Sequence, residues 1–210
     1  MSCFFTVAEE FENVIVIERS KFICTISHVE SEEQAKEFIA KIRKKYSLAN
    51  HNTYAYISDE LGLNQKFSDD GEPQGTAGMP MLNVLKLRNI FQTVAVVTRF
   101  FGGIKLGAGG LVRAYSSSVS ECLDKSKLKE MVKAVNYLVS CDYEIYSKLL
   151  PFLTEKGYKI SDIDYGDCVN FNLCARKLDE NYYLEIEKQL LNFCNGKIKL
   201  SRQLDTVSSF

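Results

Sequence analysis

The sequence predicts an α+β protein made of two α/β sandwich domains. Apolar residues recur both at alternating and at helical spacing along the chain, which indicates strands and helices in turn. The second half shows the order β-α-β-β-α-β, which is the ferredoxin-like unit. The pattern restarts near residues 131–134. We therefore expect one domain at residues 1–130 and a second at residues 134–210.

The first half is expected to open with two strands and a capped helix. Alternating apolar residues predict the strands, with a turn near Glu12 and Asn13. Ser31 and Gln34 form a capping box at the start of the helix. Pro80 is tolerated in the first turn of a second helix. The expected elements are strands 14–17 and 22–26, helix 31–47, strand 52–58, an irregular loop 59–78, a helix from Thr76, strand 91–101 and helix 110–127.

The second half is expected to hold four strands and two helices. Pro151 is expected to kink the first of these helices or to mark its start, because proline lacks the amide hydrogen that a helix interior needs. The expected elements are strand 135–143, helix 144–157, hairpin 158–178, helix 181–196 and strand 197–209.

Composition and charge narrow the class of protein. The formal net charge is −1, so attraction of nucleic acid to the whole chain is not indicated, although a local basic patch is compatible with it. Seven cysteines without a C-x-x-C pair favour a reducing compartment. The amino terminus lacks a signal peptide, and no apolar run is long enough to span a membrane. We expect a cytoplasmic protein with no membrane segment and no cofactor.

Glycine is concentrated in two segments, "SDDGEPQGTAGMP" and "RFFGGIKLGAGGLVRAY". Glycine permits positive φ and close approach of a ligand, at a cost in backbone entropy. Eight of the twelve glycines fall within these two segments, at Gly71, Gly75, Gly78, Gly102, Gly103, Gly107, Gly109 and Gly110. Each segment precedes an expected helix, whose free N–H groups attract anions. The second segment therefore predicts a phosphate or carboxylate site, with Arg99, Lys105 and Arg113 as its cations.

The first segment has the opposite charge. Asp69, Asp70 and Glu72 are candidates to ligate a hard cation, but they lack the spacing of an EF-hand. Three interpretations stay open: ion pairs that hold the two segments together, anion binding by the second segment, and metal-assisted chemistry. His51 is a candidate general base or a hydrogen-bonded residue at the start of a strand. Two histidines are too few for a histidine-rich metal site.

The same two segments closely resemble the IMPACT/YigZ family. The resemblance covers residues 51–115, and "RSKFICTI" at residues 19–26 is similar as well. It implies a first domain like the second domain of a small-subunit ribosomal protein, a β-rich sheet with helices on one face. It implies a second, ferredoxin-like domain similar to the last domain of elongation factor G. The chain resembles the bacterial branch, without the extra N-terminal domain of the eukaryotic proteins.

The resemblance also implies a link to translation. Eukaryotic IMPACT proteins compete for an activator of a kinase that responds to amino-acid starvation. We expect a binding protein that docks RNA, the ribosome or a translation component through the glycine-rich basic loop. The alternative is an enzyme acting on a phosphorylated or acidic small substrate, with a divalent metal at the Asp/Glu loop and assistance from His51. No catalytic residue is assigned.

Overall fold

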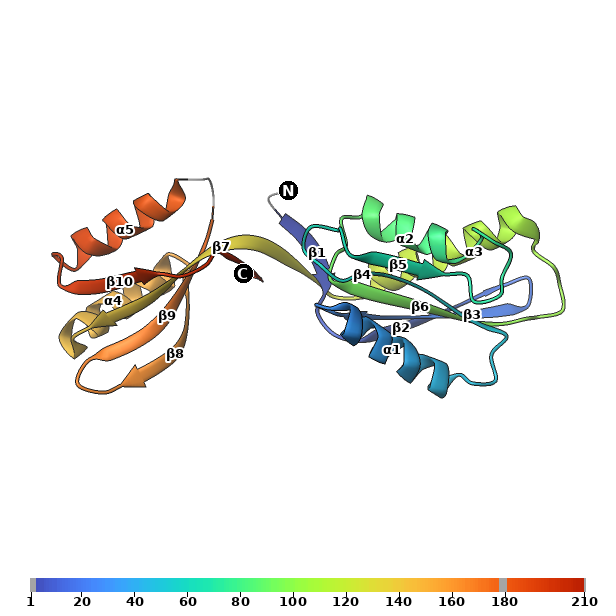
Figure 1. The fold of residues 1–210 in the computed structure, drawn as a ribbon, viewed down its shortest axis with the longest axis horizontal. Coiled ribbons are helices and arrows are strands. Elements are labelled where there is room, and N and C mark those ends of the chain that lie inside the picture. Colours follow the sequence, from blue (N-terminus) through green and yellow to red (C-terminus); the bar gives the residue numbers. More distant parts are fainter. Residues whose placement is uncertain (1–2, 178–180, 210) are drawn as a thin grey trace. The chain divides into compact units, whose positions relative to one another are not determined.

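The computed structural model describes residues 3–177 and 181–209, which form two compact units (Figure 1). The first unit is Cys3–Glu130 and the second begins at Met131. Both units combine helices with antiparallel strands, which confirms the expected α+β class with two domains of mixed structure. Leu178, the last residue of the expected hairpin, lies outside the described residues.

A five-stranded antiparallel sheet organises the first unit. Its strand order is β2-β3-β6-β4-β5, so β6 lies at the centre and β2 and β5 form the edges. The apolar run of β6 suits this central position, and all but the last of its residues are buried. The strands are β1 (Cys3–Val7), β2 (Phe11–Ile17), β3 (Ser20–His28), β4 (His51–Ile57), β5 (Gln65–Ser68) and β6 (Thr93–Phe100).

Helices cover both faces of this sheet, and not one face as the resemblance implied. Helix α1 (Glu32–Lys45) packs against Tyr56, Val94 and Val96 on one face. Helices α2 (Gly78–Leu87) and α3 (Gly107–Lys125) contact β4, β3 and β2, and Figure 1 draws them on the side opposite α1. The physical reason is that β6 is apolar on both of its sides, so each side needs a cover.

Two local predictions in the first unit were wrong. Glu12 and Asn13 lie within β2, and the turn comes at Glu18 and Arg19, which both adopt positive φ. The segment 59–78 was expected to be irregular throughout, but it contains the short strand β5. β5 was missed because four residues are too few to show a clear alternation of apolar and polar side chains.

The second unit has the predicted β-α-β-β-α-β order followed by a short extra strand. Its sheet runs β10-β7-β9-β8, with all pairings antiparallel. Pro151 lies inside the first helix and does not mark its start. The elements are β7 (Leu128–Cys141), α4 (Tyr143–Glu155), β8 (Lys159–Tyr165), β9 (Val169–Arg176), α5 (Tyr182–Phe193), β10 (Ile198–Arg202) and β11 (Thr206–Ser209).

The described helices and the cysteines have two simple properties. Among the described residues, no helix combines the length and the apolar character that crossing a membrane requires. The seven cysteines all lie in the described part of the chain and are free thiols.

Candidate functional site

The two glycine-rich segments meet at one end of the first unit's sheet, around a buried ion pair. Arg99 Nη1 lies 2.6 Å from Glu72 Oε1, and the two side chains are 6% and 3% exposed. Arg99 comes from the end of β6 and Glu72 from the loop before α2. Both charges are therefore removed from water and depend on each other for compensation. This contact supports the interpretation that ion pairs hold the two segments together.

Tyr115 of α3 completes the buried cluster. Its hydroxyl donates to Glu72 Oε1 at 2.6 Å. Burial, followed by this hydrogen bond to Glu72, raises the pKa of Tyr115 far above its usual range. The Arg99 guanidinium lies over the rings of Phe22 and Phe101, 5.3 and 5.5 Å from their centroids. Strand β6 and helix α3 thus converge on the single carboxylate that the loop before α2 supplies.

Asp70 and His51 form the next layer of contacts. Asp70 accepts hydrogen bonds from Arg43 Nη2 at 2.6 Å and from the Asn52 backbone N–H at 2.7 Å. His51 Nδ1 lies 2.8 Å from the Asp70 carbonyl oxygen. A carbonyl oxygen only accepts, so Nδ1 carries the hydrogen. His51 Nε2 lies 3.9 Å from Glu72 Oε1, which makes His51 a neighbour of the buried cluster.

The Asp69 carboxylate caps the amino terminus of α2. It accepts from the backbone N–H groups of Gly75, Ala77 and Gly78 at 2.8 to 3.0 Å. These are groups that a helix cannot satisfy internally, and a carboxylate also complements the positive end of the helix dipole. The anion site predicted at α2 is therefore occupied by a side chain of the protein itself.

The amino terminus of α3 is open by contrast. Leu106 occupies the N-cap position, and no side chain in the part of the chain that the structure describes caps the helix. Gly107, Ala108 and Gly109 are exposed at its first turn, Lys105 is exposed just before it, and Arg113 is exposed in the second turn. Free N–H groups at a helix start, next to two cations, can bind an anion.

The glycines of the second segment divide into those that the fold requires and one that it does not. A Cβ on Gly102 would lie 2.0 Å from the Arg19 carbonyl carbon, so that position excludes any side chain. Gly103 and Gly107 adopt positive φ, and a Cβ on Gly110 would meet the Leu106 side chain at 3.0 Å. Gly109 has an ordinary φ, and a Cβ there would meet nothing within 4 Å. Packing within the described residues gives no reason for glycine at Gly109.

The structure brings four of the predicted residues together, namely Arg99, Glu72, His51 and Asp70, and changes the role of Arg99. Arg99 was predicted to contact phosphate, and this is wrong for the structure described, because the side chain is buried against Glu72. Three residues of the site were not predicted from the sequence: Tyr115, which donates to Glu72, and Arg43 and Asn52, which hold Asp70. The available signal for Tyr115 was its hydroxyl, since a buried tyrosine needs a hydrogen-bond partner.

The acidic residues of the first segment are all engaged by donors of the protein. Asp69 binds backbone N–H groups, Asp70 binds Arg43 and Glu72 binds Arg99. Across residues 3–177 and 181–209, no group of three or more His, Cys, Asp or Glu side chains is arranged to hold a metal ion. The carboxylates serve as partners of cations and amides in this arrangement.

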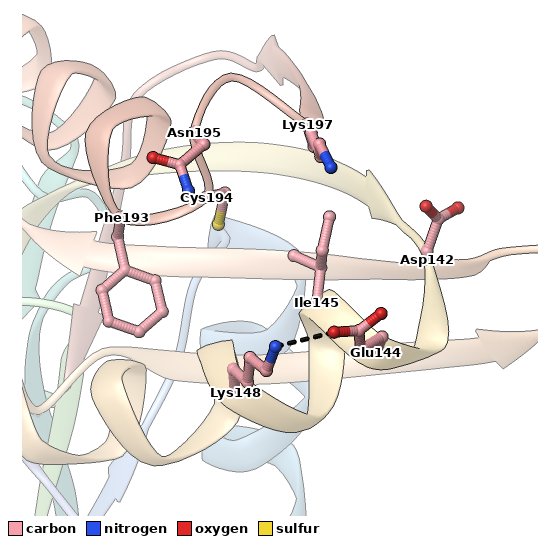
Figure 2. A pocket seen from close by; sticks show the side chains of 8 residues that line it. All are labelled: Asp142, Glu144, Ile145, Lys148, Phe193, Cys194, Asn195 and Lys197. Atoms are coloured by element: carbon pink, nitrogen blue, oxygen red, sulfur yellow. Dashed lines mark hydrogen bonds and ion pairs between the residues drawn. The ribbon is translucent and has the colours of Figure 1, made fainter.

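The second unit contains a separate pocket, which no sequence prediction anticipated. Its volume is about 230 Å³, and Figure 2 shows side chains from the start of α4 facing those that follow α5. Glu144 and Lys148 pair with each other across 2.7 Å. The lining residues are Asp142, Glu144, Ile145, Lys148, Phe193, Cys194, Asn195 and Lys197. None of the residues predicted from the glycine-rich segments lines it.

Comparisons with known proteins agree on one family. The model of the Impact N-terminal domain matches residues 18–123. IMPACT family member YvyE of Bacillus subtilis is 46% identical over 189 residues, which are 90% of this chain and 87% of that protein. IMPACT family member YigZ of Escherichia coli is 34% identical over 197 residues, covering 93% and 92%.

More distant relatives and a solved structure extend the match. Protein IMPACT of Mus musculus is 37% identical over 94 residues, which are 42% of this chain and 29% of that protein. A crystal structure of a hypothetical protein matches with a TM-score of 0.62 and 31% identity, and the match covers 95% of this chain and 97% of that one. The resemblance seen in the glycine-rich segments is thereby confirmed, and the chain belongs to the IMPACT family.

Proposed function

We propose that this protein is a cytoplasmic binding protein associated with translation, which docks on the phosphate backbone of RNA through the open start of α3. The RNA is free or part of a ribosomal assembly. Lys105 and Arg113 supply the positive charge, and the free N–H groups of the first turn supply directional donors. Arg99 holds the loop before α2 in place through its ion pair with Glu72 and does not itself contact phosphate.

One observation carries the proposal, namely the contrast between the two helix starts. Asp69 neutralises the start of α2, whereas no described side chain caps the start of α3, which has one exposed cation just before it and another in its second turn. Phosphate contacts of this kind are independent of sequence and sensitive to salt. The link to translation rests on the family resemblance alone. The names of the relatives state no binding partner.

The alternative function, an enzyme acting on a phosphorylated or acidic small substrate, has less support. It required Asp69, Asp70 or Glu72 to hold a metal or move a proton, and these carboxylates are already bound by protein donors. His51 Nε2 lies 3.9 Å from Glu72 Oε1. It would act as a base only if a substrate took the place of Glu72 beside this nitrogen.

Charge reversal of Lys105 and Arg113 tests the proposal. We expect Lys105→Glu with Arg113→Glu to weaken binding of a short fluorescein-labelled single-stranded RNA by at least about tenfold at low salt, since two phosphate contacts are lost. Fluorescence anisotropy measures the affinity. Both side chains are exposed, so the melting temperature should stay within a few degrees of that of the parent protein.

A matched control separates local contacts from net charge. Lys44→Glu with Lys188→Glu changes two exposed lysines, one on α1 and one on α5, and shifts the net charge equally. This control should bind RNA nearly as well as the parent protein. Equal affinity of the Lys105/Arg113 variant and the parent would refute the assignment. Equal weakening by the control would show that the effect comes from net charge alone.

A further inference from the structure

The pocket of the second unit contains an open helix start. Asp142 occupies the N-cap position of α4, but its carboxylate makes no capping hydrogen bond. The backbone N–H groups of Tyr143, Glu144 and Ile145 have no hydrogen-bond partner among residues 3–177 and 181–209. Asp142, Glu144 and Ile145 line the pocket. The pocket therefore offers backbone donors that suit a carboxylate or a phosphate group.

Charges of both signs lie around the same pocket. Lys197 and Asp142 form no ion pair with any described residue, whereas Glu144 and Lys148 pair with each other at 2.7 Å. Figure 2 shows the ends of Lys197, Asp142 and Glu144 gathered on one side of the pocket. Two carboxylates beside the helix start repel a doubly charged phosphate. A ligand that carries one carboxylate and one ammonium group complements this set of charges.

The other side of the pocket is apolar and holds a buried thiol. Phe193 is 43% exposed and stacks on Phe152, with ring centroids 4.4 Å apart. Cys194 is 6% exposed, and its thiol has no hydrogen-bond partner among the described residues. Burial raises the pKa of this thiol, so the group is neutral. Figure 2 shows the sulfur turned toward the space between Phe193 and Ile145, where it can contact a ligand.

The size of the pocket limits what it can hold. Its volume of about 230 Å³ lies below the range of roughly 300–1,000 Å³ that is usual for drug-sized ligands. A free amino acid is smaller, and it carries a carboxylate, an ammonium group and a side chain on one carbon atom. These three groups match the open helix start, the free carboxylate and the apolar side of the pocket.

We propose that this pocket binds a free α-amino acid with an apolar side chain. The carboxylate of the ligand accepts from the N–H groups at the start of α4 and pairs with Lys197. Its ammonium group pairs with Asp142, and its side chain packs against Ile145 and Phe193 beside the Cys194 thiol. The pocket contains no residue of the glycine-rich segments, so this inference does not rest on RNA binding.

L-leucine is a suitable probe. We expect the full chain to show saturable amide shifts in nuclear magnetic resonance spectra, centred on Tyr143–Ile145 and Phe193–Lys197, with a dissociation constant of about 1 mM or below. N-acetyl-L-leucine lacks the ammonium group and L-leucinamide lacks the carboxylate, so each should bind at least about tenfold more weakly. Glycine should also bind more weakly, because it has no side chain to bury.

Two substitutions assign the charged contacts. Lys197→Gln and Asp142→Asn should each weaken L-leucine by about tenfold, and asparagine remains a good N-cap residue for α4. Lys197→Gln should leave the affinity for L-leucinamide unchanged, since that ligand has no carboxylate to lose. Lys199→Gln and Asp167→Asn are matched controls, because both side chains are exposed and lie outside the pocket. These controls should bind L-leucine as the parent protein does.

Three results would overturn the proposal. One is the absence of amide shifts around the pocket at L-leucine concentrations up to about 10 mM. Another is an affinity for N-acetyl-L-leucine or L-leucinamide that equals the affinity for L-leucine. The third is equal weakening by the pocket substitutions and by the controls, which would show that net charge and not the pocket determines binding.

Discussion

Glu72 is the residue on which the candidate site depends. It accepts from Arg99 and from Tyr115, each at 2.6 Å, in surroundings from which water is excluded. Removing one partner of a buried pair leaves the other charge unpaired, which costs more than the pair contributes. Pairing between the acids and the cations was one of three interpretations of the sequence, which offers Arg99, Lys105 and Arg113 as partners without favouring any of them. Burial decides which cation pairs with Glu72, because Arg99 is the one of these three cations that lies in the sheet.

Glu72→Gln should destabilise the first unit by roughly 3–5 kcal/mol, because Arg99 then keeps a buried charge without a counter-ion. Tyr115→Phe should cost less, about 1.5–3 kcal/mol, because it removes one hydrogen bond to a charged group. Urea unfolding followed by circular dichroism measures both. A loss below about 0.5 kcal/mol for Glu72→Gln would mean that the pair is solvated and that the cluster is not structural.

At the scale of elements, the two helix starts differ in a way that the sequence only partly predicted. Both were expected to attract anions because each follows a glycine-rich segment. The cap at α1 was predicted, since Ser31 and Gln34 are close in sequence and Ser31 Oγ indeed accepts from the Gln34 N–H at 3.2 Å. The cap at α2 was not, because Asp69 lies nine residues before Gly78 and reaches it only once the loop has folded back.

Asp69→Ala should therefore destabilise α2 by about 1–2 kcal/mol, as for the loss of a strong N-cap. Asp69→Asn should cost less, since an amide oxygen still accepts hydrogen bonds. Amide hydrogen exchange should show faster exchange in α2 and little change in α1. Exchange that speeds up equally in both helices would point to global unfolding and against a local cap.

At the scale of the whole molecule, the order of elements was predictable and the layering of the first unit was not. The β-α-β-β-α-β order of the second unit follows from periodicity, because each element there is long enough to show its period. Sequence periodicity does not say which face of a sheet a helix covers. The apolar run of β6 was the available signal that both faces of its sheet are covered.

Buried tyrosines should make the stability of the protein fall at alkaline pH. Burial raises the pKa of Tyr56 to about 12, and it raises the pKa values of Tyr115, Tyr137 and Tyr158 as well. These phenols stay protonated in the folded state but ionise near pH 10 when unfolded. Above about pH 10 the unfolded state binds fewer protons, so the free energy of unfolding decreases as pH rises.

Urea unfolding between about pH 8 and pH 11 measures this decrease, and the ultraviolet absorbance of tyrosinate reports ionisation. Ionisation of these tyrosines should coincide with unfolding. A free energy of unfolding that stays constant over this interval would contradict the prediction.

Gly109→Ala tests most directly whether the start of α3 receives a phosphate backbone. The described residues give no steric reason for glycine there, so the added methyl group should leave the free energy of unfolding unchanged or increase it by up to about 0.5–1 kcal/mol. The methyl group lies where we propose that the RNA backbone approaches. We predict weaker binding of the labelled RNA by this variant, with stability maintained. Undiminished RNA affinity in Gly109→Ala would contradict close approach of a phosphate at this helix start.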